Sequence, residues 1–92
     1  MNIKDTIQSK LEKHINIKYI DISDTTGRHI NHHNFDGGHH LTAIIVSNNF
    51  KSIDLIERHR MVYNALGSLI KNEIHAFSMK TYTESEWNSH VT

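Results

Sequence analysis

Two β-rich segments separated by an amphipathic helix place the strongest limit on the fold of this chain. Residues 41–47 form a continuous apolar run, and residues 74–82 alternate between two faces, so both are predicted strands. Between them, core-type residues recur every three or four positions, which predicts a helix: Leu55, Ile56, His59, Val62, Tyr63, Leu66, Leu69 and Ile70. Val62 and Tyr63 are expected in the core, and Gly67 predicts either close packing or a local helix end. A right-handed crossover through this helix makes the two strands parallel.

The rest of the chain adds two shorter helices and one strand. Apolar side chains at a four-residue spacing over residues 3–11 predict a first helix, and the β-branched and aromatic residues 17–23 predict a strand. Thr83 and Glu86 have the spacing of a capping box, which predicts a closing helix. The sequence therefore predicts an α+β fold in the order α-β-β-α-β-α. Its helices cover one face of a three-stranded mixed sheet, in a single domain over residues 1–92.

Histidine is the unusual residue of this composition. The 92 residues include nine histidines and no cysteine. Imidazole binds transition metals and titrates near neutral pH, whereas a chain without thiols needs His, Asp, Glu or a partner's sulfur to hold a metal. Four of the histidines fall in residues 24–39, a stretch with turn formers and no periodicity, which predicts a long loop between the first two strands.

Charge and hydropathy disfavour several classes of function. Ten basic residues balance ten acidic ones, so bulk attraction to nucleic acid or to an anionic membrane is not expected. No apolar run approaches the roughly 20 residues of a membrane span, and the first residues lack a signal-peptide pattern, so a cytoplasmic protein without membrane contact is expected. Motifs of nucleophilic, phosphate-binding and zinc hydrolase sites are absent, so no enzyme activity is expected.

Three segments of the chain together resemble the signature of BolA proteins. They are residues 46–50 (VSNNF), 58–66 (RHRMVYNAL) and 73–83 (EIHAFSMKTYT), and the resemblance extends over nearly the whole chain. It implies a fold like a class II KH domain, with the order of elements given above. It also implies a complex with a monothiol glutaredoxin around a [2Fe-2S] cluster, and bacterial members of the family are linked to transcriptional regulation.

The resemblance further implies which histidines ligate the cluster. His75 corresponds to the family's ligating histidine, in the strand after the long helix. The second ligand comes from the loop between the first two strands, where His29 is favoured over His32, His33 and His40. A solvated loop that binds nickel or zinc adventitiously is the competing interpretation of these loop histidines. Glutaredoxin and glutathione would supply the sulfur ligands, since histidines can replace two of the four thiolates around a [2Fe-2S] cluster.

Basic side chains predict a surface for contact with a partner that is separate from the histidines. Arg58 and Arg60 flank His59 on the long helix, which cannot present all three on one face, so the arginines are expected outward and His59 toward the core edge. Together with Lys80, they are candidates for contact with a nucleic-acid phosphate or an acidic patch of a partner protein.

Three hypotheses about function follow. The first is a non-enzymatic adaptor in iron-sulfur cluster trafficking or iron regulation, monomeric alone and heterodimeric with glutaredoxin. The second is a KH-like, DNA-binding transcriptional regulator, although the GXXG clamp of KH domains is missing. The third is a histidine-rich protein that binds zinc or nickel.

Overall fold

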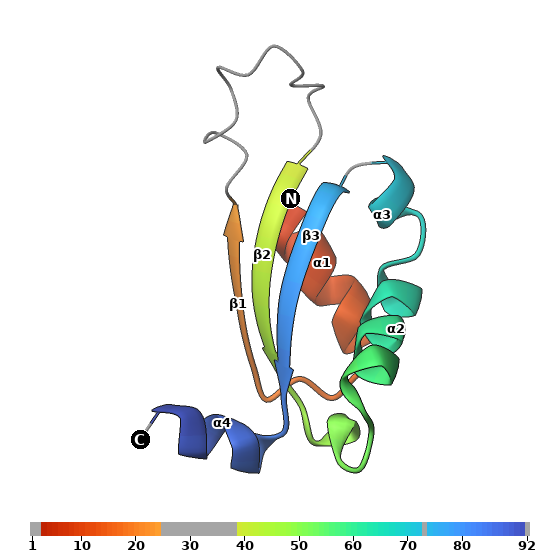
Figure 1. Cartoon of the computed structure of the whole chain (residues 1–92). Coiled ribbons are helices and arrows are strands. Elements are labelled where there is room, and N and C mark those ends of the chain that lie inside the picture. The colour runs from red at the N-terminus through yellow and green to blue at the C-terminus, as the bar shows by residue number, and fades with distance from the viewer. Residues whose placement is uncertain (1–2, 25–38, 73, 92) are drawn as a thin grey trace.

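The computed structural model describes residues 3–24, 39–72 and 74–91, and its elements follow the predicted order (Figure 1). They are α1 (Ile3–Glu12), β1 (Tyr19–Asp24), β2 (His39–Val46), the short 3-10 helix η2 (Asn48–Phe50), α2 (Leu55–Leu66), α3 (Leu69–Asn72), β3 (Ile74–Tyr82) and α4 (Glu84–Val91). Within these described ranges, no helix has the length and hydropathy needed to cross a membrane.

The three strands form one mixed sheet in the order β1-β2-β3. β1 and β2 pair antiparallel, with Tyr19 opposite Val46 and Asp24 opposite Leu41. β2 and β3 pair parallel, with Val46 opposite Tyr82, which confirms the predicted crossover. β1 therefore ends at the same end of the sheet at which β2 and β3 begin (Figure 1).

α1 and α2 lie on one side of the sheet and enclose the core (Figure 1). The buried side chains come from these two helices, the strands, η2, α3 and the segment after α1. They are Ile7, Leu11, Ile15, Ile22, Leu41, Ala43, Ile45, Phe50, Val62, Ala65, Leu66, Leu69 and Ile74. Val62 is fully buried, which confirms its predicted position in the core. A chain of this size supports one such core.

Gly67 ends α2. Its φ of 58° is a left-handed conformation, and its backbone N–H donates to the Tyr63 carbonyl at 3.0 Å. A Cβ added at Gly67 would meet nothing within 4 Å, so conformation and not close packing explains the glycine. The chain then turns into α3, which packs against β3.

The connection from β2 to α2 is held by side-chain caps. Ser47 Oγ accepts a hydrogen bond from the Asn49 backbone N–H at 3.0 Å and caps η2. Ser52 has a φ of 61°, a conformation that costs a residue with a side chain about 1–2 kcal/mol. Asp54 Oδ1 then accepts from the Glu57 backbone N–H at 2.9 Å and caps α2.

The closing helix α4 begins at the predicted capping box. Thr83 Oγ1 accepts from the Glu86 backbone N–H at 3.1 Å. Glu86 Oε1 in turn accepts from the Thr83 backbone N–H at 2.8 Å. This reciprocal pair satisfies two N–H groups that the first helical turn leaves without a backbone partner.

The prediction that the helices all cover one face of the sheet is wrong for α4, which covers part of the face opposite α1 and α2 because Trp87 packs on aromatic strand residues there. Tyr19, Val46 and Tyr82 lie side by side in the strand register, on the face away from the main core. The Trp87 ring stacks on Tyr19, with centroids 5.3 Å apart, and lies 5.3 Å from the Tyr82 ring. Val46 is consequently buried without belonging to the core under the helices. Trp87 thus completes a second, smaller apolar cluster.

Candidate functional site

His75 lies at the start of β3, where the pairing with β2 shifts register. His39 pairs with Ile74 and His40 pairs with Ala76, so His75 is the extra residue between two paired positions. Such a bulge bends the strand locally and re-aims the residues around it. The backbones of three histidines therefore lie next to one another at this end of the sheet.

The bulge also changes the predicted faces of β3. Regular alternation places Ile74 and Phe77 on opposite faces, but both line the same apolar hollow, so the prediction is wrong at Ile74. The extra residue at His75 accounts for the difference, because it returns Ile74 to the helix side, where it is buried.

The predicted loop of second ligands joins the sheet at this same end. β1 ends at Asp24 and β2 begins at His39, so both ends of the connection lie at the end of the sheet where β3 begins. Three predicted ligands fall outside the described residues, namely His29, His32 and His33. His40 is described and is partly buried. Among the described residues, no three His, Cys, Asp or Glu side chains are grouped so that they could hold a metal ion by themselves.

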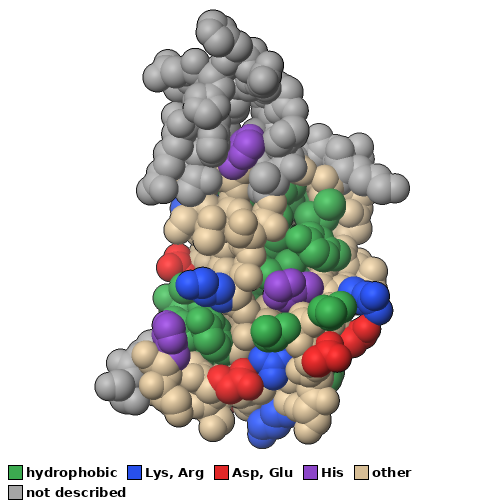
Figure 2. Space-filling model, viewed as in Figure 1, with side chains coloured by type: hydrophobic (Ala, Val, Ile, Leu, Met, Phe, Trp, Pro, Cys, Tyr) green, Lys and Arg blue, Asp and Glu red, His purple; other side chains and the backbone are tan. Residues whose placement is uncertain are grey.

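An apolar hollow of about 350 Å³ adjoins the start of β3 and is lined by Tyr63, Ile70, Ile74 and Phe77. Figure 2 shows hydrophobic side chains gathered on this face between β3 and the helices. The Tyr63 hydroxyl donates to the Phe77 carbonyl at 3.3 Å, and the two rings meet edge to face at 6.4 Å. Tyr63 is 40% exposed, so its predicted burial in the core is wrong.

Arg58 does not point outward as the sequence predicts. The residue is buried, and its Nε donates to the Ile53 carbonyl at 2.7 Å. Nη1 donates to the Thr81 carbonyl at 3.3 Å and to Glu86 Oε1 at 2.8 Å, while Nη2 donates to Glu86 Oε2 at 3.2 Å. The guanidinium also lies 5.7 Å from the centre of the Phe50 ring. Arg58 therefore ties α2 to β3 and α4, and its side chain is committed to these internal contacts and not to an external partner.

The ion pair with Arg58 sets the electrostatics of this region. A hydrogen bond from Arg58 and another from the Thr83 backbone lower the pKa of Glu86 from 4.5 to about 2, against the smaller opposing effect of burial. Glu86 is therefore ionised at any physiological pH.

Arg60 and Lys80 are both exposed, as predicted. Arg60 Nη1 contacts Glu57 Oε1 at 2.6 Å within α2. Lys80 is paired with Ile44 across the sheet, on the face that α1 and α2 leave uncovered. The structure thus separates the three predicted basic contacts into one internal and two surface residues.

Sequence comparisons identify the family. A model of the family described as BolA-like protein matches residues 11–86. This chain belongs to the BolA-like protein family. An uncharacterized protein of Buchnera aphidicola is 37% identical to this BolA-like protein over 83 residues, which cover 90% of this chain and 78% of the relative. The DNA-binding transcriptional regulator BolA of Escherichia coli is 30% identical over 89 residues, which cover 95% of this chain and 81% of the relative.

Solved structures agree with the fold of this BolA-like protein. The crystal structure of a bol-like protein from Babesia bovis matches with a TM-score of 0.81 and 27% identity, over 100% of this chain and 96% of that chain. The match confirms the predicted fold class and the three-stranded mixed sheet.

Proposed function

We propose that this BolA-like protein is a non-enzymatic, cytoplasmic adaptor that ligates a [2Fe-2S] cluster jointly with a monothiol glutaredoxin, in cluster trafficking or iron regulation. The observation that carries the proposal is the position of His75. Its backbone lies at a bulge beside those of His39 and His40, at the sheet end to which the histidine-bearing connection is attached.

The donor set of the chain fits half of such a cluster. A [2Fe-2S] cluster needs four ligands, and two histidines on one iron can replace two thiolates. This chain has nine histidines and no cysteine, so it can offer the nitrogen half only. His75 would supply one nitrogen and His29 the second, with His32, His33 and His40 as alternatives. Glutaredoxin and glutathione would supply the sulfur half, and the protein alone would be a monomer without the cluster.

The apolar hollow beside His75 supports a protein partner on this side. A partner that brings iron to the start of β3 would also reach Tyr63 and Phe77, whose rings border the hollow. Covering such apolar surface favours association.

The test uses the full-length protein with cluster-loaded monothiol glutaredoxin. We expect a heterodimer whose visible absorption and circular dichroism differ from those of glutaredoxin alone. His75→Ala should change that spectrum, because one ligand of the iron is lost, while the far-ultraviolet spectrum stays that of the folded domain. His14→Ala, at an exposed histidine after α1, is the matched control and should leave the complex unchanged. An identical visible spectrum for the His75→Ala complex would remove His75 from the ligand set.

DNA binding is the second candidate, because the Escherichia coli relative is described as a DNA-binding transcriptional regulator. Burial of Arg58 reduces the basic surface available for phosphates, and leaves Arg60 and Lys80 as the candidate contacts. Binding through phosphates must weaken as salt rises, with a slope set by the number of contacts. A titration of duplex DNA at low and moderate salt tests this candidate, and the absence of binding at low salt would reject it.

A further inference from the structure

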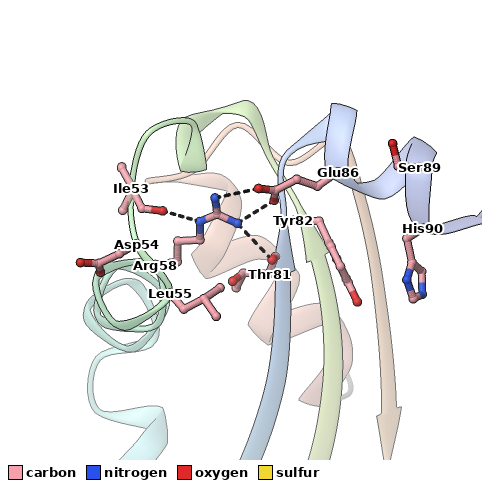
Figure 3. Close-up of a pocket in the computed structure, with 9 residues that line it drawn as sticks. All are labelled: Ile53, Asp54, Leu55, Arg58, Thr81, Tyr82, Glu86, Ser89 and His90. Carbon is pink, nitrogen blue, oxygen red and sulfur yellow. Dashed lines mark hydrogen bonds and ion pairs between the residues drawn. The ribbon is translucent and has the colours of Figure 1, made fainter.

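A second hollow lies at the opposite end of β3 from His75, where α2 begins and α4 crosses the sheet (Figure 3). Its volume is about 730 Å³, and its lining includes Leu55, Arg58, Thr81, Tyr82, Glu86 and His90. These residues come from α2, β3 and α4, three elements that pack on one another and fix the shape of the hollow. Neither the cluster hypothesis nor the DNA hypothesis uses it.

The walls of this hollow are apolar and accessible. Leu55 is 60% exposed although it is a large aliphatic residue, and in Figure 3 it lies on one side of the β3 edge while the Tyr82 ring lies on the other. The Tyr82 ring lies 5.2 Å from the His90 ring, and the two form an aromatic wall. An aliphatic stem that lies across the β3 edge, against Leu55 and this wall, would remove part of both from water.

The charge that the hollow presents to a ligand is negative. The Arg58 side chain is 8% exposed, whereas 47% of the Glu86 side chain is exposed. Of about four acceptor positions on a carboxylate, Glu86 uses two on Oε1 and one on Oε2, so Oε2 can accept a further hydrogen bond. Asp54 also belongs to the lining, and although its carboxylate caps α2 and points away from Glu86 in Figure 3, it adds negative charge at longer range.

The lining of the hollow also contains a buried hydroxyl group. Thr81 Oγ1 is buried and has no hydrogen-bond partner within the described part of the chain. Leaving such a group unsatisfied costs about 1–3 kcal/mol. The oxygen is closed off from solvent, so this cost belongs to the folded domain and not to ligand contact.

We propose that this hollow docks a basic segment of a partner protein, whose arginine or lysine side chain crosses the β3 edge in contact with Leu55 and Tyr82 and places its cationic head at Glu86 Oε2. The aliphatic stem fits the apolar walls, and the head group meets the accessible carboxylate. Because the hollow and His75 lie at opposite ends of β3, a partner bound here leaves the cluster-binding end free.

The test titrates the isotope-labelled full chain with the acetylated, amidated peptide Leu-Arg-Leu and follows backbone amide signals by NMR. Shifts are expected at Leu55, Tyr82 and His90, and not at Ile74 or His75. Binding should weaken as salt rises, since both partners are charged and partly exposed. The peptides Leu-Gln-Leu and Leu-Glu-Leu should bind at least fivefold more weakly.

Three variants make the test specific. Leu55→Ser should weaken binding of the arginine peptide about tenfold through loss of apolar contact. Ile56→Ser is the matched control, because Ile56 is 66% exposed but does not line the hollow, and the change should be less than twofold. Asp54→Asn removes a charge but keeps an N-cap residue, and should weaken binding about twofold to fivefold at low salt. Absence of shifts at millimolar peptide, equal binding of the glutamate peptide, or equal effects of Leu55→Ser and Ile56→Ser would each overturn the proposal.

Discussion

Replacing Glu86 by glutamine isolates the contribution of the Arg58–Glu86 ion pair to stability. Glutamine can still close the capping box with Thr83, so the substitution removes the charge and leaves the helix start in place. It also leaves the guanidinium of Arg58 buried without its counter-charge. Losing one member of a fully buried ion pair costs 3–5 kcal/mol, which sets an upper limit.

The shift in the pKa of Glu86 allows a closer estimate. A pKa lowered from 4.5 to about 2 corresponds to at most about 3.4 kcal/mol of stabilisation. Because 47% of the Glu86 side chain is exposed, water screens the interaction, and we expect a loss of about 1–2 kcal/mol for Glu86→Gln near neutral pH. The matched control is Glu57→Gln, which breaks the exposed pair with Arg60 and should cost less than about 0.5 kcal/mol.

The pH dependence has a defined sign. The folded pKa of Glu86 lies below the unfolded value, so its stabilisation is complete above about pH 5.5 and is lost as pH falls through 4.5 toward 2. The difference in free energy of unfolding between the natural protein and Glu86→Gln, measured by urea denaturation, should shrink to less than half by about pH 3. A difference that stays constant between pH 7 and pH 3, or a loss no larger than that of Glu57→Gln, would refute this account of the pair.

Three further substitutions test local features of the fold by the same urea assay. Thr81→Val replaces the unpartnered hydroxyl by a methyl group of similar size and should stabilise the domain by about 1 kcal/mol, whereas a destabilisation above 1 kcal/mol would reveal a hydrogen bond at Oγ1. Ser52→Gly relieves a φ of 61° and, after the greater entropy of the unfolded glycine chain, should stabilise by about 0.5 kcal/mol. Gly67→Ala should destabilise by about 1–2 kcal/mol, because the φ of 58° disfavours a side chain even where nothing would touch it; an unchanged midpoint would contradict that reason.

The sequence predicted those parts of the fold that depend on a repeated spacing of residues or on contacts between residues close together in the chain. The crossover through α2 and the capping box at Thr83 and Glu86 depend on spacing alone, and both were confirmed. The bulge at His75 was missed, because a single extra residue depends on the pairing with β2 and leaves no mark in the alternation of the strand itself.

Arg58 shows why part of the candidate site was misjudged. Its charge favoured an outward position, yet it lies four residues before Val62 and seven before Ala65, in phase with the buried stripe of α2. This position in the buried stripe was the feature of the sequence from which the burial of Arg58 could have been predicted. What the sequence could not supply was the partner, since Glu86 is 28 residues away and reaches Arg58 only after β3 and α4 have packed. The ligating role of His75 and His29 stays a prediction.

The ring of Trp87 has a consequence for the order in which the chain folds during synthesis. Tyr19 and Tyr82, the strand residues whose rings lie against Trp87, both emerge from the ribosome earlier, and Tyr19 precedes Trp87 by 68 positions. Before α4 is synthesised, Val46 is therefore exposed on one face of a nascent hairpin of β1 and β2. Before α2 is synthesised, the other face of this hairpin lacks the cover of that helix. Apolar strand surface left uncovered on both sides promotes misassociation. The native state thus depends on residues synthesised late to cover apolar residues synthesised early. We expect that removal of α4 lowers the yield of folded protein more than the small size of this helix suggests.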